Sequence, residues 1–106
     1  MTRQAHADLS MERTVKPTLR WGETDLFSAA DAPKLLDYCE RNHVTVLGIE
    51  GFLVKDNRRV PDMGAIADYS ELDRTNDGSR LSVGAARKFF TSIGNSDLLF
   101  EFELKA

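Results

Sequence analysis

The segment "DLLFEFELK", residues 97–105, constrains the fold more than any other part of the sequence. Its side chains alternate in character along an extended chain, with one apolar series and one mixed series. The first series is Leu98, Phe100, Phe102 and Leu104, and the second is Leu99, Glu101 and Glu103. A period of two is typical of a strand with one core face and one partly wet face. The segment therefore predicts a sheet that is covered on one side.

Two amphipathic helices are expected to supply that cover. In "DAPKLLDYCERN", residues 31–42, apolar side chains recur at helical spacing, Asp31 can cap the helix, and Pro33 is tolerated in the first turn. In "SVGAARKFFTSIG", residues 82–94, we expect Ser82 as the N-cap and Gly94 as the stop. Cys39 falls on the apolar side of the first helix and is predicted to be a buried, unreactive thiol.

The stretch between these helices has the composition of a hairpin. "VTVLGIEGFLV", residues 44–54, is rich in β-branched and aromatic residues, and "KDN" before "RRV" predicts a turn and a returning strand. Pro61 cannot donate to a ladder, so it ends or interrupts that strand, which "MGAIADYS" resumes at a sheet edge. The predicted class is α+β: a two-layer sandwich, in which a mostly antiparallel sheet of three to four strands is covered by two helices, in the order α-β-β-α-β.

A chain of 106 residues is expected to form one domain. We assign residues 1–18 to a flexible lead and residues 19–106 to a single α+β domain. The apolar runs are far shorter than the ~20 residues of a membrane span, and the first twenty residues lack the apolar segment of a secretory signal. The lone Cys39 suits a reducing compartment, so a cytoplasmic protein without a membrane partner is expected.

The net charge of −3 is unevenly distributed. Between Asp62 and Asp77 the chain carries five acidic residues and one basic residue, Arg74. Such a patch repels the phosphates of nucleic acid and attracts basic proteins, so no nucleic-acid partner is expected. A solvated loop that keeps the protein soluble accounts for the same charges equally well.

Enzymatic signatures are weak. His43 ends a predicted helix and has no matching nucleophile elbow, and the sequence has neither a Cys and His cluster nor a glycine-rich phosphate loop. We therefore expect no catalytic residue, no cofactor and no metal. The alternative is a small metal-dependent hydrolase or nuclease, in which Asp62, Asp68 and Glu103 would be ligands and Lys105 the base.

Recognition by a protein is the remaining class of function. Glu50 is expected on the same strand face as Val46, Gly48 and Phe52, which places an acid beside apolar surface. Aromatic anchors ringed by charges are typical of protein interfaces. A buried Glu50 that bonds to the backbone or to Arg58 explains its position equally well.

The run "VLGIEGFLV", the later "PDMGAIADYSEL" and the closing "LLFEFELK" resemble small bacterial immunity proteins. These are the antidotes encoded beside polymorphic or contact-dependent growth inhibition (CDI) toxins, and the likeness covers about residues 35–104. The resemblance implies a small non-enzymatic cytoplasmic protein that binds the C-terminal domain of its toxin, often a nuclease with a basic cleft. Its interface is inferred from this sequence's own charge and aromatic placement. The expected partner-binding residues are Glu50, Phe52, Asp62, Asp68, Tyr69, Glu71 and Asp73.

Overall fold

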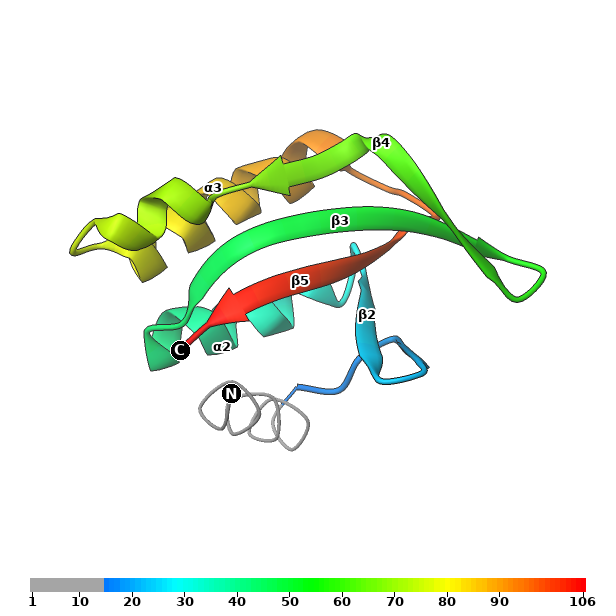
Figure 1. The fold of residues 1–106 in the computed structure, drawn as a ribbon, viewed down its shortest axis with the longest axis horizontal. Coiled ribbons are helices and arrows are strands. Elements are labelled where there is room, and N and C mark those ends of the chain that lie inside the picture. Colours follow the sequence, from blue (N-terminus) through cyan, green and yellow to red (C-terminus); the bar gives the residue numbers. More distant parts are fainter. Residues whose placement is uncertain (1–14) are drawn as a thin grey trace.

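The fold is seen in a computed structural model, which describes residues 15–106 (Figure 1). Most of the lead expected at residues 1–18 lies outside the described residues. Of the remainder, Val15 is buried in the core, and the Thr18 hydroxyl accepts a hydrogen bond of 2.8 Å from the Ser28 amide.

Seven elements of regular structure and one 3₁₀ turn make up the described part. They are β1 (Leu19–Trp21), β2 (Thr24–Ser28), α2 (Ala32–Asn42), β3 (Thr45–Lys55), β4 (Arg58–Asp68), η1 (Ser70–Arg74), α3 (Gly78–Ile93) and β5 (Leu99–Lys105). The strands form one antiparallel sheet in the order β1-β2-β5-β3-β4. The α+β class is therefore confirmed. The expected sheet of three to four strands and the expected order were wrong in detail, because a β1–β2 hairpin precedes α2 and adds to the sheet.

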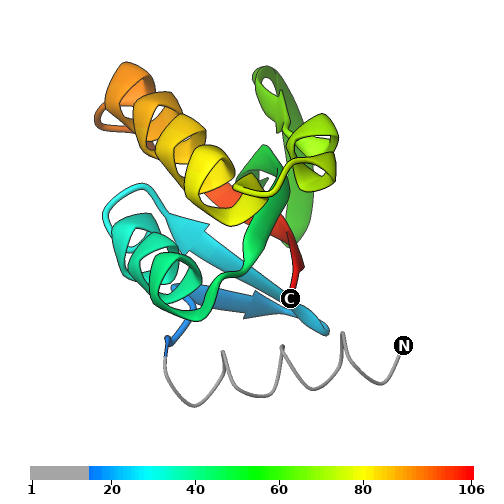
Figure 2. The same cartoon turned by 90° about the vertical axis from the view of Figure 1, so that its left-hand side faces the viewer.

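The helices α2 and α3 lie side by side on one face of the sheet (Figure 2). Between them and the strands lies the core, in which Phe90 of α3 packs edge-on against Phe100 and stacks against Phe102 of β5. Burying each such side chain stabilises the fold by roughly 1.5–3 kcal/mol. The predicted core series of β5 therefore faces the helices, and Glu101 and Glu103 point to the opposite face.

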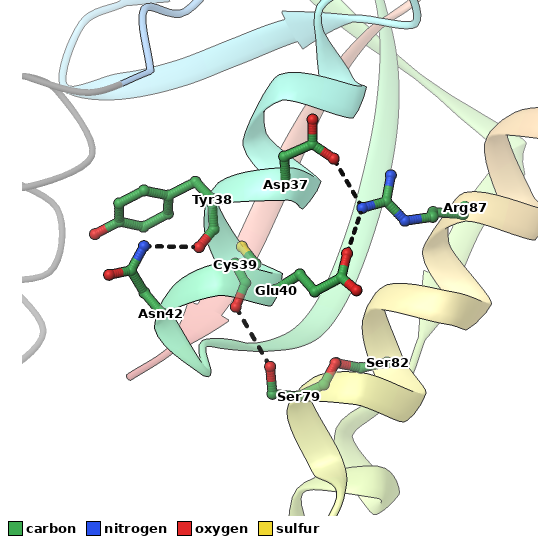
Figure 3. Close-up of polar contacts among 8 residues, drawn as sticks. All are labelled: Asp37, Tyr38, Cys39, Glu40, Asn42, Ser79, Ser82 and Arg87. Atoms are coloured by element: carbon green, nitrogen blue, oxygen red, sulfur yellow. Dashed lines mark hydrogen bonds and ion pairs between the residues drawn. The ribbon is translucent and has the colours of Figure 1, made fainter.

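Polar contacts on the outer side of the core hold the helices together (Figure 3). The Arg87 guanidinium donates to Asp37 at 2.9 Å and to Glu40 at 2.8 Å, and the Ser79 hydroxyl donates to the Cys39 carbonyl. Burial raises the pKa of the Cys39 thiol to about 12, because the thiolate would lose its hydration. Cys39 is thus the buried thiol that its spacing predicted.

The helix α3 begins one turn earlier than expected, and Ser82 lies inside it rather than at its N-cap. The Ser82 side chain is fully buried. Its hydroxyl accepts a hydrogen bond from the Val46 amide at 2.9 Å and donates to the Ser79 carbonyl at 3.1 Å. The bond from the Val46 amide to Ser82 gives β3 a hydrogen-bond partner where its pairing with β5 is irregular, between Val46 and Gly48.

Candidate functional site

The face of the sheet opposite the helices, here called the open face, carries the candidate site. The register places Glu50 of β3 directly opposite Glu101 of β5, and Glu103 opposite Gly48. On the other side of β3, Ile66 of β4 pairs with Glu50 and Asp68 pairs with Gly48. Paired residues share a face of a sheet, so four carboxylates gather around the middle of β3.

The irregular pairing of β3 explains why Glu50 belongs to this face. Val46 pairs with Leu104, which is buried beneath the helices, whereas Gly48 pairs with Glu103 on the open face. Leu47 is the extra residue between them and reverses the alternation of the strand. The expectation that Glu50 shares a face with Val46 was therefore wrong, although its grouping with Gly48 and Phe52 was right.

A shallow groove with a volume of about 740 Å³ runs over the open face. Strands β3, β4 and β5 form its floor, the β1–β2 hairpin forms one wall, and no residue of α2 or α3 lines it. The carboxylates that line it are Glu23, Asp25, Glu50, Asp68, Glu101 and Glu103. Within the described part, Arg20 is the one basic residue on its lining, and its guanidinium pairs with Asp25 at 3.0 Å. The groove is strongly acidic as a result.

Only part of this charge is neutralised within the described chain. The Glu101 carboxylate accepts a hydrogen bond of 3.2 Å from Arg59, and the Asp68 carboxylate accepts one of 2.9 Å from the Ser70 amide. The bonds from Ser70 lower the pKa of Asp68, so this carboxylate stays charged in mildly acidic solution. No ion pair or side-chain hydrogen bond of Glu50 or Glu103 occurs among the described residues. Arg58, the predicted alternative partner of Glu50, instead lies opposite Lys55 at the closed end of the β3–β4 hairpin, and no ion pair joins it to Glu50. Like charges directly opposite in a sheet repel, so the open face holds charge that the described fold does not offset.

The two aromatic residues expected at the interface have structural roles. Phe52 lies on the open face but is 5% exposed, and the Arg59 guanidinium covers its ring at 4.3 Å from the centroid. Tyr69 packs against the core, and its hydroxyl donates to the Ala85 carbonyl at 3.3 Å. Burial also raises the pKa of the Tyr69 phenol. The apolar side chain that the groove does expose is Ile66, at 44%.

The other expected partner-binding acids lie apart from the groove. Asp62 sits in a bulge of β4 between Pro61 and Ile66, where its carboxylate accepts a hydrogen bond of 2.9 Å from the Gly64 amide. Glu71 is exposed on η1, and Asp73 accepts a bond of 2.7 Å from Lys105. Of the seven expected residues, the structure thus brings Glu50 and Asp68 together at the groove.

The ligand set of the alternative hydrolase does not converge. Asp68 and Glu103 flank Gly48, whereas Asp62 lies within the bulge of β4, and Lys105 is engaged by Asp73. In residues 15–106 no group of three or more His, Cys, Asp or Glu side chains is arranged to hold a metal ion. His43 ends α2 in a left-handed conformation, with φ of 57°, and does not line the groove.

Glu101 was not predicted as a site residue, and Glu103 was predicted only as a ligand of the alternative hydrolase, although the alternation of β5 placed both on the face of the strand away from the core. Neither described helix is long and apolar enough to cross a membrane.

Comparison with known proteins yields no match: no family model, no curated protein and no solved structure is significantly similar to this chain. The function must therefore be inferred from the groove.

Proposed function

We propose that this chain is an immunity protein that neutralises a cognate bacterial toxin, and that its acidic groove binds a basic surface of the toxin's C-terminal domain. The chain acts by binding and not by catalysis, in the cytoplasm of the cell that produces both proteins. The observation that carries the proposal is the cluster of Glu50, Glu101 and Glu103 around the middle of β3, with one arginine, Arg59, bonded to it.

Like-charge pairs on a folded surface favour a role in binding. Glu50 and Glu101 lie directly opposite each other on the adjacent strands β3 and β5, and two like charges in that position destabilise a sheet. A partner with lysine or arginine side chains would relieve that repulsion on binding. The complex would therefore gain both the new ion pairs and the release of strain in the free protein.

A nuclease domain is the kind of toxin that fits this surface best. Enzymes that bind a phosphate backbone line their clefts with lysine and arginine, because those side chains neutralise phosphates. An acidic groove that docks on such a cleft would exclude the nucleic acid from the active site or from the channel that leads to it. Complementary charge would also speed encounter of the two proteins. Ile66, exposed in the groove, supplies an apolar contact.

Co-expression with the protein encoded immediately upstream tests this proposal. Two variants remove three negative charges each. The face variant combines Glu50→Gln, Glu101→Gln and Glu103→Gln, and the loop variant combines Asp62→Asn, Glu71→Gln and Asp73→Asn. We expect the wild type and the loop variant to protect cells from the toxin domain, and we expect the face variant, shown to be folded by circular dichroism, to lose protection.

Two results would overturn the proposal. One is a wild-type chain that neither protects cells nor forms a complex with the upstream product. The other is full protection by the face variant, because the groove would then be dispensable.

A further inference from the structure

The β3–β4 hairpin extends beyond the rest of the sheet. Pairing of β3 with β5 ends at Phe52 and Leu99, whereas β3 and β4 continue to pair with each other as far as Lys55 and Arg58. Asp56 and Asn57 close the hairpin with φ of 54° and 61°, the signature of a tight two-residue turn. Figure 1 shows this end of the hairpin projecting past the helices. Residues 53–60 therefore form a two-stranded ribbon, here called the ribbon.

One face of the ribbon carries apolar and cationic side chains that the described fold leaves exposed. Leu53 and Val60 pair across the strands and are 41% and 52% exposed, and the next pair on the same face is Lys55 with Arg58. Neither cation has an ion pair among the described residues. Arg59 lies on the other face and is engaged with Glu101. Exposed apolar pairs flanked by unpaired charges are typical of interaction surfaces.

The acidic groove has the complementary chemistry. Its unpaired carboxylates, Glu50 and Glu103, occupy neighbouring strands on one face, at diagonal positions about 7–8 Å apart. Ile66, opposite Glu50, offers apolar surface beside them. A two-stranded ribbon is about 4.8 Å wide between strand axes, whereas the groove extends across β5, β3 and β4 to the β1–β2 hairpin. The floor of the groove is therefore one strand wider than the ribbon.

We propose that the ribbon of one copy docks in the acidic groove of a second copy of this chain. In that contact Leu53 and Val60 cover Ile66 of the second copy, and Lys55 and Arg58 pair with its Glu50 and Glu103. The ribbon cannot reach its own groove, because it continues the same strands that form the groove floor. The contact is head-to-tail, so a pair of copies joined by it leaves one ribbon and one groove free, and further copies add to these ends as an open chain.

This association would occupy the surface that the proposed function assigns to the toxin. A toxin domain that binds the groove would therefore displace the ribbon. The assembly would dissociate into complexes of one toxin domain with one immunity chain. Only this last consequence rests on the proposed function, since the self-association itself follows from the ribbon and the groove.

Analytical ultracentrifugation of the chain alone tests the proposal. At low ionic strength and increasing protein concentration, we expect the wild type to show a rising average mass, which high salt reverses because the ion pairs are exposed. The ribbon variant, Lys55→Glu with Arg58→Glu, and the groove variant, Glu50→Lys with Glu103→Lys, are each expected to remain monomeric.

Recombining the variants separates a lost contact from a damaged fold. An equimolar mixture offers native ribbons from the groove variant and native grooves from the ribbon variant, so we expect dimers that do not grow further. The chain that carries all four reversals is expected to associate again. A wild type that stays monomeric at millimolar concentration, or a ribbon variant that associates as the wild type does, would overturn the proposal.

Binding of the wild-type ribbon to duplex DNA or anionic vesicles without self-association would likewise overturn it and assign the ribbon to another partner. Because no toxin is present in these measurements, failure of self-association leaves the protection assay unaffected.

Discussion

Replacement of Glu50 by Gln is expected to stabilise the free protein. Glu50 lies directly opposite Glu101, so the two carboxylates are about 6 Å apart when their side chains extend from Cβ atoms about 5 Å apart. Two unit charges at that distance repel by about 0.7 kcal/mol in water. Arg59 offsets part of this repulsion through its bond to Glu101. We therefore expect a gain of about 0.5 kcal/mol, or about 2–4 °C in melting temperature.

Urea unfolding at low and at high salt measures this effect. The gain should disappear near 1 M salt, where the Debye length is about 3 Å and shorter than the distance between the carboxylates. Glu71→Gln is the matched control, because it removes the same charge from an exposed position on η1 and should change the stability little at either salt concentration. Destabilisation by Glu50→Gln would mean that Glu50 stabilises the fold, and a gain of equal size at high salt would mean that the effect is not electrostatic. Either result would contradict the predicted repulsion between Glu50 and Glu101.

Three further substitutions or conditions test the fold around the site. Ser82→Ala leaves the buried Val46 amide without its acceptor and should lower the unfolding free energy by about 1–3 kcal/mol in urea titration. Gly51→Ala should cost about 1–3 kcal/mol in the same assay, because the new methyl would lie 2.8 Å from the Ala65 Cβ atom, whereas Gly84→Ala, which meets nothing within 4 Å, should not destabilise. The Cys39 pKa is raised from 9.0 to about 12, so the unfolded thiol ionises first and stability should fall as the pH rises from 9.0 toward 12; a Cys39→Ala variant that loses the same stability over this range would contradict that cause.

Local patterns predicted the helices and β5 because each depends on the spacing of neighbouring residues. The first turn of α3 was missed, since "NDGS" reads as a turn. Glycine is required at position 78 by a contact with another element, because a Cβ atom there would lie 2.7 Å from the Leu72 carbonyl oxygen. The strand β2 was also missed, because it is short and its place in the sheet depends on pairing Phe27 and Ser28 with β5, some seventy residues later.

The candidate site was predicted in fragments. The alternation of β5 placed Glu101 and Glu103 on a wet face, and the composition of β3 drew attention to Glu50. Their meeting depends on the register between two strands and on the extra residue Leu47, which no local pattern reveals. The dense acidic stretch from Asp62 to Asp77 was more visible in the sequence, but its charges point to several parts of the surface.

The open face of the sheet, and not the acidic stretch from Asp62 to Asp77 as a whole, is the surface that we propose binds a basic toxin domain. This proposal is tested by calorimetric titration of the C-terminal domain of the protein encoded immediately upstream into the wild type, the face variant and the loop variant. We predict that the face variant binds roughly a hundredfold more weakly, a loss of about 2.7 kcal/mol, whereas the loop variant binds within about threefold of the wild type. A face variant with wild-type affinity, or a loss of affinity confined to the loop variant, would contradict the assignment of the open face as the binding surface.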